Sequence, residues 1–177
     1  METLEKECIV EFDEIIQDLE ENETVQEMKK YIQHCDTTCY DHCRNVAYHS
    51  YLICKKYGLD YRSAARGGML HDLFLYNWRK SQRDVELNGL HAFEHPKIAL
   101  FNSMKLFDLN AIEKDIIVKH MWPVTIRFPR YKESYVITLV DKYSALHETF
   151  EYIKKKQKMQ KWYRYACVFL SMLILKI

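Results

Sequence analysis

Turn-forming residues are scarce in this chain, which has only 4 glycines and 3 prolines among its 177 residues. A sandwich or barrel of many short hairpins needs such residues at most of its turns, so their scarcity disfavours those folds and favours long helices. Hydrophobic residues make up 48% of the chain and charged residues 29%, which is typical of soluble globular proteins and excludes disordered, collagen-like and multi-span membrane classes. A chain of this length suits one domain with one substantial core.

Apolar spacing and capping residues predict an all-α domain, a single bundle of six or seven helices over residues 1–177. Gly58 suits a left-handed position just after a helix, and Asn110 with Glu113 has the spacing of a capping box. Pro96 suits the first turn of a helix. The predicted helices cover residues 4–28, 39–57, 64–75, 95–106, 110–120 and 133–156, and an apolar segment follows at 166–175.

Charge is distributed unevenly along the chain, although the net charge is only +1. Residues 1–30 carry 3 lysines and 11 acidic residues, which gives −8, and residues 151–177 carry 7 basic residues and 1 glutamate, which gives +6. These two ends should attract each other. The middle of the chain has no dense basic stripe, which argues against a nucleic-acid-binding surface because such a surface depends on many phosphate contacts.

The basic segment 154–164 and the apolar segment 166–175 together form a C-terminal tail whose partner the sequence leaves open. Ten apolar residues are too few to span a bilayer, which takes ~20. The tail could dock on an anionic membrane surface, pack on the acidic first helix, or pack on a second subunit in a homodimer. We expect packing on the first helix, because that segment carries the opposite charge.

The first residues are acidic and lack the apolar stretch of a secretory signal, so a cytoplasmic location is expected. Six cysteines in a reducing compartment are then expected to be small buried residues, or ligands, rather than disulfides. Cys35, Cys39 and Cys43 lie near His34 and His42, which invites a zinc interpretation. These cysteines are four residues apart, however, which places their thiols along one face of a helix. Structural zinc sites usually take their cysteines from a tight turn, the zinc knuckle, and this spacing does not form one.

His71 and Asp72 are the most informative pair for function. They follow Gly67 and Gly68, and adjacent glycines inside a helix cost roughly 1 kcal/mol each relative to alanine. We therefore expect a neighbouring helix to approach the backbone there and to bring its own side chains close to the pair. Asp141 interrupts an apolar run, and a buried carboxylate is costly unless a cation or hydrogen bonds compensate it.

His42, the pair His71-Asp72 and then Asp141, each on its own predicted helix, follow the order found in the HD-domain superfamily of metal-dependent phosphohydrolases, which this chain resembles. The resemblance covers residues 36–150, most of the chain. It implies an all-α metal-site core and hydrolysis of a phosphate ester or anhydride of a small molecule, such as a nucleotide.

His95 followed by Pro96, and His120 further on, are similar to the additional ligands of the two-metal branch of that superfamily. That branch includes dinucleoside-polyphosphate hydrolases and cyclic-dinucleotide phosphodiesterases. Imidazole and carboxylate ligands suit Fe, Mn, Zn, Ni or Co and do not choose among them. The resemblance implies one metal ion held by His42, His71, Asp72 and Asp141, and a second held by Asp72, His95 and His120.

One position departs from the superfamily pattern, because Leu75 stands where many members have a lysine. A cation that faces the phosphate must then come from elsewhere in the chain. Lys142, next to a predicted ligand, is our first candidate for this catalytic role. Arg66, Lys97 and Arg79 are weaker candidates, since long basic side chains are usually solvated.

The surroundings of the predicted site carry weaker signals. Residues 79–94 are polar and irregular, so we expect a loop there, with His91 as a loop residue that could also act as a substitute ligand or contact one. Tyr76, Trp78 and Trp122 flank the predicted ligands and could stack on a nucleobase, although core packing explains them equally well.

Two other functions remain open for the same residues. Some proteins with the HD fold use a di-iron pair to activate O2, and the predicted ligand set is compatible with that chemistry. Alternatively, the metal could only hold the helices together in a non-catalytic binding module.

Overall fold

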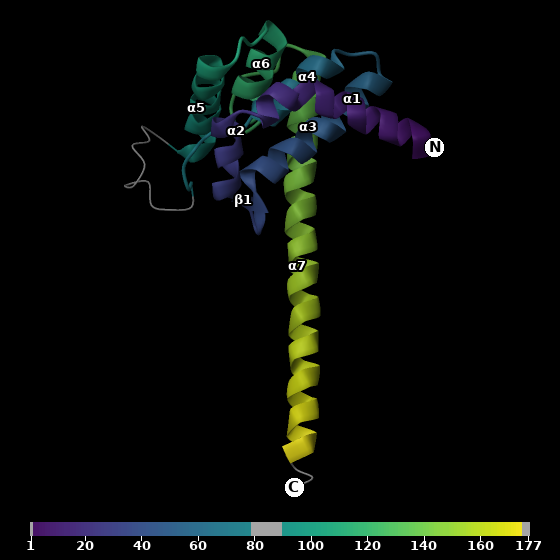
Figure 1. The fold of residues 1–177 in the computed structure, drawn as a ribbon. Coiled ribbons are helices and arrows are strands. Elements are labelled where there is room, and N and C mark those ends of the chain that lie inside the picture. Colours follow the sequence, from purple (N-terminus) through teal and green to yellow (C-terminus); the bar gives the residue numbers. More distant parts are fainter. Residues whose placement is uncertain (1, 79–89, 175–177) are drawn as a thin grey trace.

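Helices form nearly all of the regular structure of this protein (Figure 1), which confirms the predicted all-α fold class. The computed structural model describes residues 2–78 and 90–174, with side chains for residues 5–78 and 90–162. Of the loop predicted over residues 79–94, residues 79–89 lie outside the described residues. The helices are α1 (Glu2–Glu20), α2 (Glu23–Gln26), α3 (Cys39–Lys56), α4 (Tyr61–Leu70), α5 (His91–Leu106), α6 (Ala111–Lys119) and α7 (Lys132–Ile174).

The acidic N-terminal segment forms two helices and a turn rather than the single helix predicted over residues 4–28. The Asn22 side chain accepts the backbone N–H groups of Thr24 and Val25 and so caps α2 instead of continuing α1. A 3-10 turn, η1 (Glu27–Lys30), completes the segment. The apolar face of α1 is buried as predicted, through Phe12, Ile15, Ile16 and Leu19.

A small antiparallel hairpin of β1 (Ile32–His34) and β2 (Thr37–Thr38) follows η1 and was not predicted. Its turn contains Cys35 at a φ of 51°, a left-handed conformation that is uncommon for a residue other than glycine. Strands of three and two residues are too short to show the alternating apolar pattern by which a strand is recognised in a sequence. Thr38 ends the hairpin and caps α3 by accepting the N–H of Asp41.

Two predicted helix ends are confirmed. Asn110 and Glu113 form a complete capping box at the start of α6. Gly58 has a φ of 65° just after α3, the left-handed conformation that glycine adopts without strain.

The glycine pair of α4 allows close packing on both sides of this helix. A Cβ atom on Gly68 would lie 2.8 Å from Cα of Ala47 on α3. A Cβ atom on Gly67 would lie 2.8 Å from Cδ1 of Ile116 on α6. The predicted close approach at this pair is therefore confirmed, with one glycine facing each neighbouring helix.

Helix α4 ends at Leu70, well before the predicted end at residue 75, with His71 as its C-cap. His71 and Asp72 thus lie in the turn that follows the helix, where the N–H of Phe74 donates to the carbonyl of Asp72 at 2.7 Å. Inside a helix, consecutive side chains diverge by ~100°. A turn relaxes this constraint, so that His71 Nε2 and Asp72 Oδ2 lie 3.6 Å apart.

Helix α5 begins at His91, a full turn before the predicted start at His95. The carbonyl of Leu90 accepts the N–H groups of Phe93 and Glu94 at 2.9 and 3.2 Å, which starts the helix there. Pro96 therefore lies inside the helix rather than in its first turn, and its missing N–H leaves out one helical hydrogen bond.

Helix α7 is much longer than the predicted helix 133–156, and it projects as a shaft away from the rest of the molecule (Figure 1). The chain contains no glycine or proline after Pro129 that would end it. The basic part of the tail does not pack on the acidic first helix as predicted, because the side chains of residues 154–162 are exposed and α1 lies beside the other end of α7. The side chains of the apolar part, 166–175, lie outside the described residues. Within the described residues, no helix combines the length and apolar character that crossing a membrane requires.

Candidate metal centre

The six side chains predicted as metal ligands come together in the interior of the bundle. They come from α3, the turn after α4, α5, the C-cap of α6, and α7. Each of these residues is at most 8% exposed. Burial of so many donor atoms is costly unless a charge between them compensates. The six are His42, His71, Asp72, His95, His120 and Asp141.

One group of donors joins α3, the turn after α4, and α7. His42 Nε2 lies 3.0 Å from Asp141 Oδ1, and His71 Nε2 lies 3.8 Å from the same oxygen. Ligand atoms of these three residues all lie within 4.8 Å of one another. They are close enough to bind one ion with the nitrogen and oxygen ligands that transition metals accept.

Asp72 joins this group to a second one. Its Oδ1 lies 3.2 Å from His95 Nε2 and 3.3 Å from His120 Nε2, and these two nitrogens are 2.9 Å apart. Its Oδ2 lies 3.6 Å from His71 Nε2. Asp72 thus has one oxygen facing each group, which is the arrangement that a bridging carboxylate requires.

Backbone carbonyls determine which nitrogen of three imidazoles carries the proton. In His71, His95 and His120, Nδ1 lies 2.7 to 2.9 Å from a carbonyl oxygen. A carbonyl only accepts, so Nδ1 carries the proton and Nε2 of the neutral ring presents a lone pair. The Nε2 atoms of His95 and His120 and Oδ1 of Asp72 therefore direct lone pairs at one another, and this mutual repulsion is relieved by a cation between them.

The orphaned atoms of the site lead to the same conclusion. Among the described residues, His71 Nε2 and Asp72 Oδ1 are buried without a hydrogen-bond partner. A buried polar atom without a partner costs about 1–3 kcal/mol. The donor set therefore fits a metal ion, although the role of the six residues as ligands stays a prediction.

The site keeps its carboxylates ionised. Burial alone raises the pKa of Asp72, but the neighbouring imidazoles of His71 and His95 hold it well below its usual range. Burial also raises the pKa of Asp141, yet the hydrogen bond with His42 and the nearby imidazole of His71 lower it below its ordinary value. Two negative charges thus face the imidazoles, as binding of a cation requires.

The hairpin supplies two site residues that sequence reasoning missed as such. Gln33 Nε2 donates a hydrogen bond to Asp72 Oδ2, which leaves Oδ1 directed at the second group. The ring of His34 meets the ring of His42 edge to face, with centroids 5.0 Å apart. No pattern in the sequence could have identified them, because the hairpin itself is too short to predict.

Glu148 is a third missed residue. Its Oε1 lies 2.9 Å from Nδ1 of His42, whose other nitrogen faces Asp141. Two carboxylates of α7 thus hold this imidazole, one at each nitrogen. Glu148 follows Asp141 by seven residues, which is about two turns of one helix face. That spacing is a signal that could have identified it.

A pocket of about 260 Å³ opens onto the site. The ring of His91 lies between Trp78 and His95, with centroid distances of 5.2 and 4.5 Å. His91 is the first residue of α5 rather than a loop residue, and burial lowers its pKa to about 4, so it is neutral. The Tyr76 hydroxyl lies 3.0 Å from its Nδ1 and donates to it when that nitrogen is unprotonated. The remaining wall includes Ala92, Met121, Val124, Lys142 and Ala145.

Trp122 does not belong to this wall, and its flanking position in the sequence was misleading. Its ring packs against Phe128 and Tyr135 instead, with centroids 5.7 Å from each. Of the three aromatic candidates, only Trp78 lines the pocket. Tyr76 contacts His91, which is itself a residue of the pocket wall.

Lys142 is the candidate cation that the structure places at the site. It lines the pocket, and its Nζ donates to the carbonyls of His120 and Thr138 at 3.0 and 3.3 Å. Burial lowers its pKa, and the nearby Asp141 partly opposes that effect.

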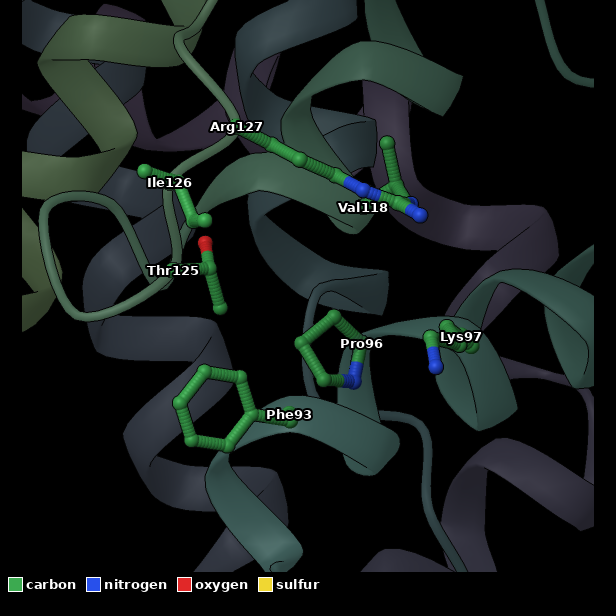
Figure 2. Close-up of a pocket in the computed structure, with 7 residues that line it drawn as sticks. All are labelled: Phe93, Pro96, Lys97, Val118, Thr125, Ile126 and Arg127. Atoms are coloured by element: carbon green, nitrogen blue, oxygen red, sulfur yellow. The ribbon is translucent and has the colours of Figure 1, made fainter. Parts of the chain in front are cut away.

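Two of the three weaker candidates, Arg66 and Lys97, lie away from the site. Arg66 forms ion pairs with Asp18 and Glu113 on another side of α4. Lys97 lies at a separate pocket of about 220 Å³, where Phe93 and Pro96 of α5 face the loop after α6 (Figure 2). Arg79 lies outside the described residues.

The cysteines match the prediction as far as they are described. Five are free thiols, and Cys39, Cys43 and Cys54 are buried. Cys39 Sγ donates to the carbonyl of Asp72 at 3.2 Å and so helps to hold the turn. Cys39 and Cys43 thus act as small core residues next to the site, whereas Cys8 and Cys35 are only half-buried.

The buried donors thus form two groups that share one carboxylate, with a small pocket and one lysine beside them. No protein-family model, curated protein or solved structure matches the chain. The function therefore has to be argued from the chemistry of these residues.

Proposed function

We propose that this protein is a metal-dependent phosphohydrolase of the HD-domain type, which cleaves a phosphate ester or anhydride of a small molecule such as a nucleotide. One observation carries the proposal: His95 Nε2, His120 Nε2 and Asp72 Oδ1 lie within 3.3 Å of one another. Since the Nδ1 protons are held by carbonyls, these three atoms have only lone pairs to offer each other. A divalent cation among them accounts for the arrangement.

Two ions fit the donor set better than one, because the donors form two groups that share Asp72. When bound, the ions supply Lewis acidity that lowers the pKa of water and neutralises charge on phosphoryl oxygens. Fe, Mn, Zn, Ni and Co all suit these ligands. We assign His42, His71, Asp72 and Asp141 to the first ion and Asp72, His95 and His120 to the second.

Other residues position the ligands and the substrate. Gln33 holds Asp72 Oδ2, and backbone carbonyls hold the rings of His71, His95 and His120. The N-terminal end of α5 lies at the pocket, where its free N–H groups add partial positive charge for an anionic ligand.

Lys142 is the residue we assign to the phosphoryl group. Replacing Lys142 by methionine keeps the length of the side chain and removes its charge, so we expect kcat/KM to fall on the order of 100-fold. Metal content should not change, because Lys142 donates hydrogen bonds and is no ligand. Steady-state kinetics with elemental analysis of the same samples measures both.

The matched control for Lys142 is Lys97→Met in the neighbouring pocket. It removes the same charge from a lysine that pairs with Glu94 away from the site. An equal loss of kcat/KM in both variants would remove Lys142 from the proposed mechanism.

Glu148 positions His42 in this proposal, since it accepts the Nδ1 proton and leaves Nε2 directed at Asp141 and the ion. Replacing Glu148 by glutamine keeps an acceptor of similar shape but removes the charge. Loss of such a partner typically lowers metal affinity about 10- to 100-fold. Competition with a chelator measures this affinity, and Glu151→Gln, at an exposed position of the same helix, should leave it unchanged.

The function itself is tested on purified protein by elemental analysis, phosphate release from a panel of nucleotides and phosphoesters, and oxygen uptake. We expect two ions per chain and metal-dependent phosphate release without oxygen uptake. Oxygen consumption by iron-loaded protein, without phosphate release, would instead identify a di-iron oxygenase. Melting that depends on metal, with no turnover of any compound, would identify a binding module, and either result contradicts the hydrolase.

A further inference from the structure

Among the residues that the structure describes, none packs on the part of α7 from residue 156 to residue 162. The last contact that anchors the shaft to the hairpin is the ion pair between Lys155 and Asp36, at 2.9 Å. Beyond it, every side chain described up to residue 162 is exposed. Trp162 is 69% exposed and Met159 is 66% exposed. Large apolar side chains at such exposure, at the end of a projecting helix, indicate an interaction surface.

Charge indicates what this surface binds. Five exposed lysines crowd into residues 154–161 without an acidic residue among them. The sequence then changes abruptly, because residues 165–175 contain no charged residue and are mostly apolar. A cluster of lysines next to an apolar run is typical of a segment that binds the anionic face of a lipid bilayer.

Trp162 lies where the basic segment meets the apolar one. Tryptophan is enriched at the level of lipid headgroups, because its ring is apolar and its N–H is polar. We propose that the end of α7 docks this protein on an anionic lipid bilayer, with the lysines at the headgroups and the apolar run of the sequence directed into the acyl chains.

A second copy of the chain fits this surface less well. Two α7 shafts side by side would bring lysines together, and like charges repel. The acidic α1 of a second copy could pair with the lysines, but Phe12, Ile16 and Leu19 of its apolar face are buried in its own core. Such a pairing would leave the apolar run of the shaft in water.

The test uses the full chain and sedimentation with vesicles of phosphatidylcholine alone or mixed with phosphatidylserine. We expect binding only to the mixed vesicles, and weaker binding at high salt. Replacing Lys156, Lys158 and Lys161 together by glutamate should lower the partition coefficient by at least about 100-fold, because each basic residue near an anionic surface contributes to the attraction. The control variant replaces three exposed lysines of the body, Lys29, Lys56 and Lys105, by glutamate in the same way. It should bind the mixed vesicles as the wild type does.

A second measurement does not depend on the charge variants. Trp162 emission should shift to shorter wavelength on addition of the mixed vesicles, and the shift should be absent in Trp162→Phe. The proposal is overturned if the protein ignores mixed vesicles, or if both lysine variants bind equally well. It is also overturned if the three α7 lysines prove to be needed for a salt-sensitive dimer that forms without lipid, which would assign the surface to a second copy.

Discussion

Replacing Asp72 by alanine is expected to remove both bound metal and turnover. Asp72 faces His71 with one carboxylate oxygen and His95 and His120 with the other, so its loss removes the negative charge shared by both groups of donors. Metal ions contribute several kcal/mol of transition-state stabilisation, and this corresponds to a loss of turnover on the order of 1000-fold. Elemental analysis and steady-state kinetics on the same preparation measure the two effects.

The control for Asp72 is Asp115→Asn on α6. Asp115 is also a buried carboxylate, but it accepts hydrogen bonds from the backbone of Arg130 and from Ser134 outside the site. We expect this variant to be less stable and to keep its metal. If Asp72→Ala retained full metal content, or if metal-free wild type turned over at the full rate, the proposed function would be wrong.

Replacing Gly68 by alanine should destabilise the fold and weaken the site together. The added Cβ atom would meet the backbone of Ala47 at 2.8 Å, so α3 and α4 would have to move apart. Overpacking of this kind costs typically 1–3 kcal/mol, and a methyl group held against backbone lies at the upper end because no side chain can move aside. Separation of the two helices also moves His42 away from His71.

Alanine favours a helix by about 1 kcal/mol over glycine, which offsets part of this cost. We therefore expect Gly68→Ala to lower the free energy of unfolding by about 2 kcal/mol, which lowers Tm by roughly 4–8 °C in a chain of this size. Thermal unfolding by circular dichroism, with a chelator competition for metal affinity, measures both effects.

Gly67→Ala is the matched control. Its Cβ would meet only side-chain atoms, those of Ile116 at 2.8 to 3.1 Å, and alanine favours a helix by about 1 kcal/mol over glycine, which offsets part of the clash. The free energy of unfolding should then change by less than about 1 kcal/mol. Equal destabilisation by the two substitutions would contradict the assignment of Gly68 to the contact between α3 and α4.

The helices of the body were the most predictable part of the fold. Caps and turn residues act over a few positions, so the capping box at Asn110 and the left-handed Gly58 could be identified without the folded chain. Periodicity was less reliable at Leu70, where apolar residues continue after the helix has ended. Leu73 and Phe74 are buried in the turn after α4, and they would have to be apolar there just as in a longer helix, so their apolar character does not show where the helix ends.

Those site residues were predictable whose type is unusual for their place in the sequence. An aspartate in an apolar run and a His-Asp pair after two glycines are unusual enough to be noticed, and the structure brings them together with His42, His95 and His120. Gln33 and His34 carry no such signal, because their role comes from a hairpin of a few residues. The same holds for the choice of Lys142 over Arg66 and Lys97, which depends on where each side chain ends in space.

Local information in the chain was enough to predict an all-helical bundle and several of its helix ends, and the resemblance to the HD-domain superfamily selected the six donor residues. Only the tertiary structure decided how these parts meet. It joins the two groups of donors through Asp72 and places the pocket beside Lys142, and it directs the α7 shaft away from the acidic α1. The reason is physical. Helix formation and capping involve residues a few positions apart, whereas distances across the bundle depend on packing between segments that are remote in sequence.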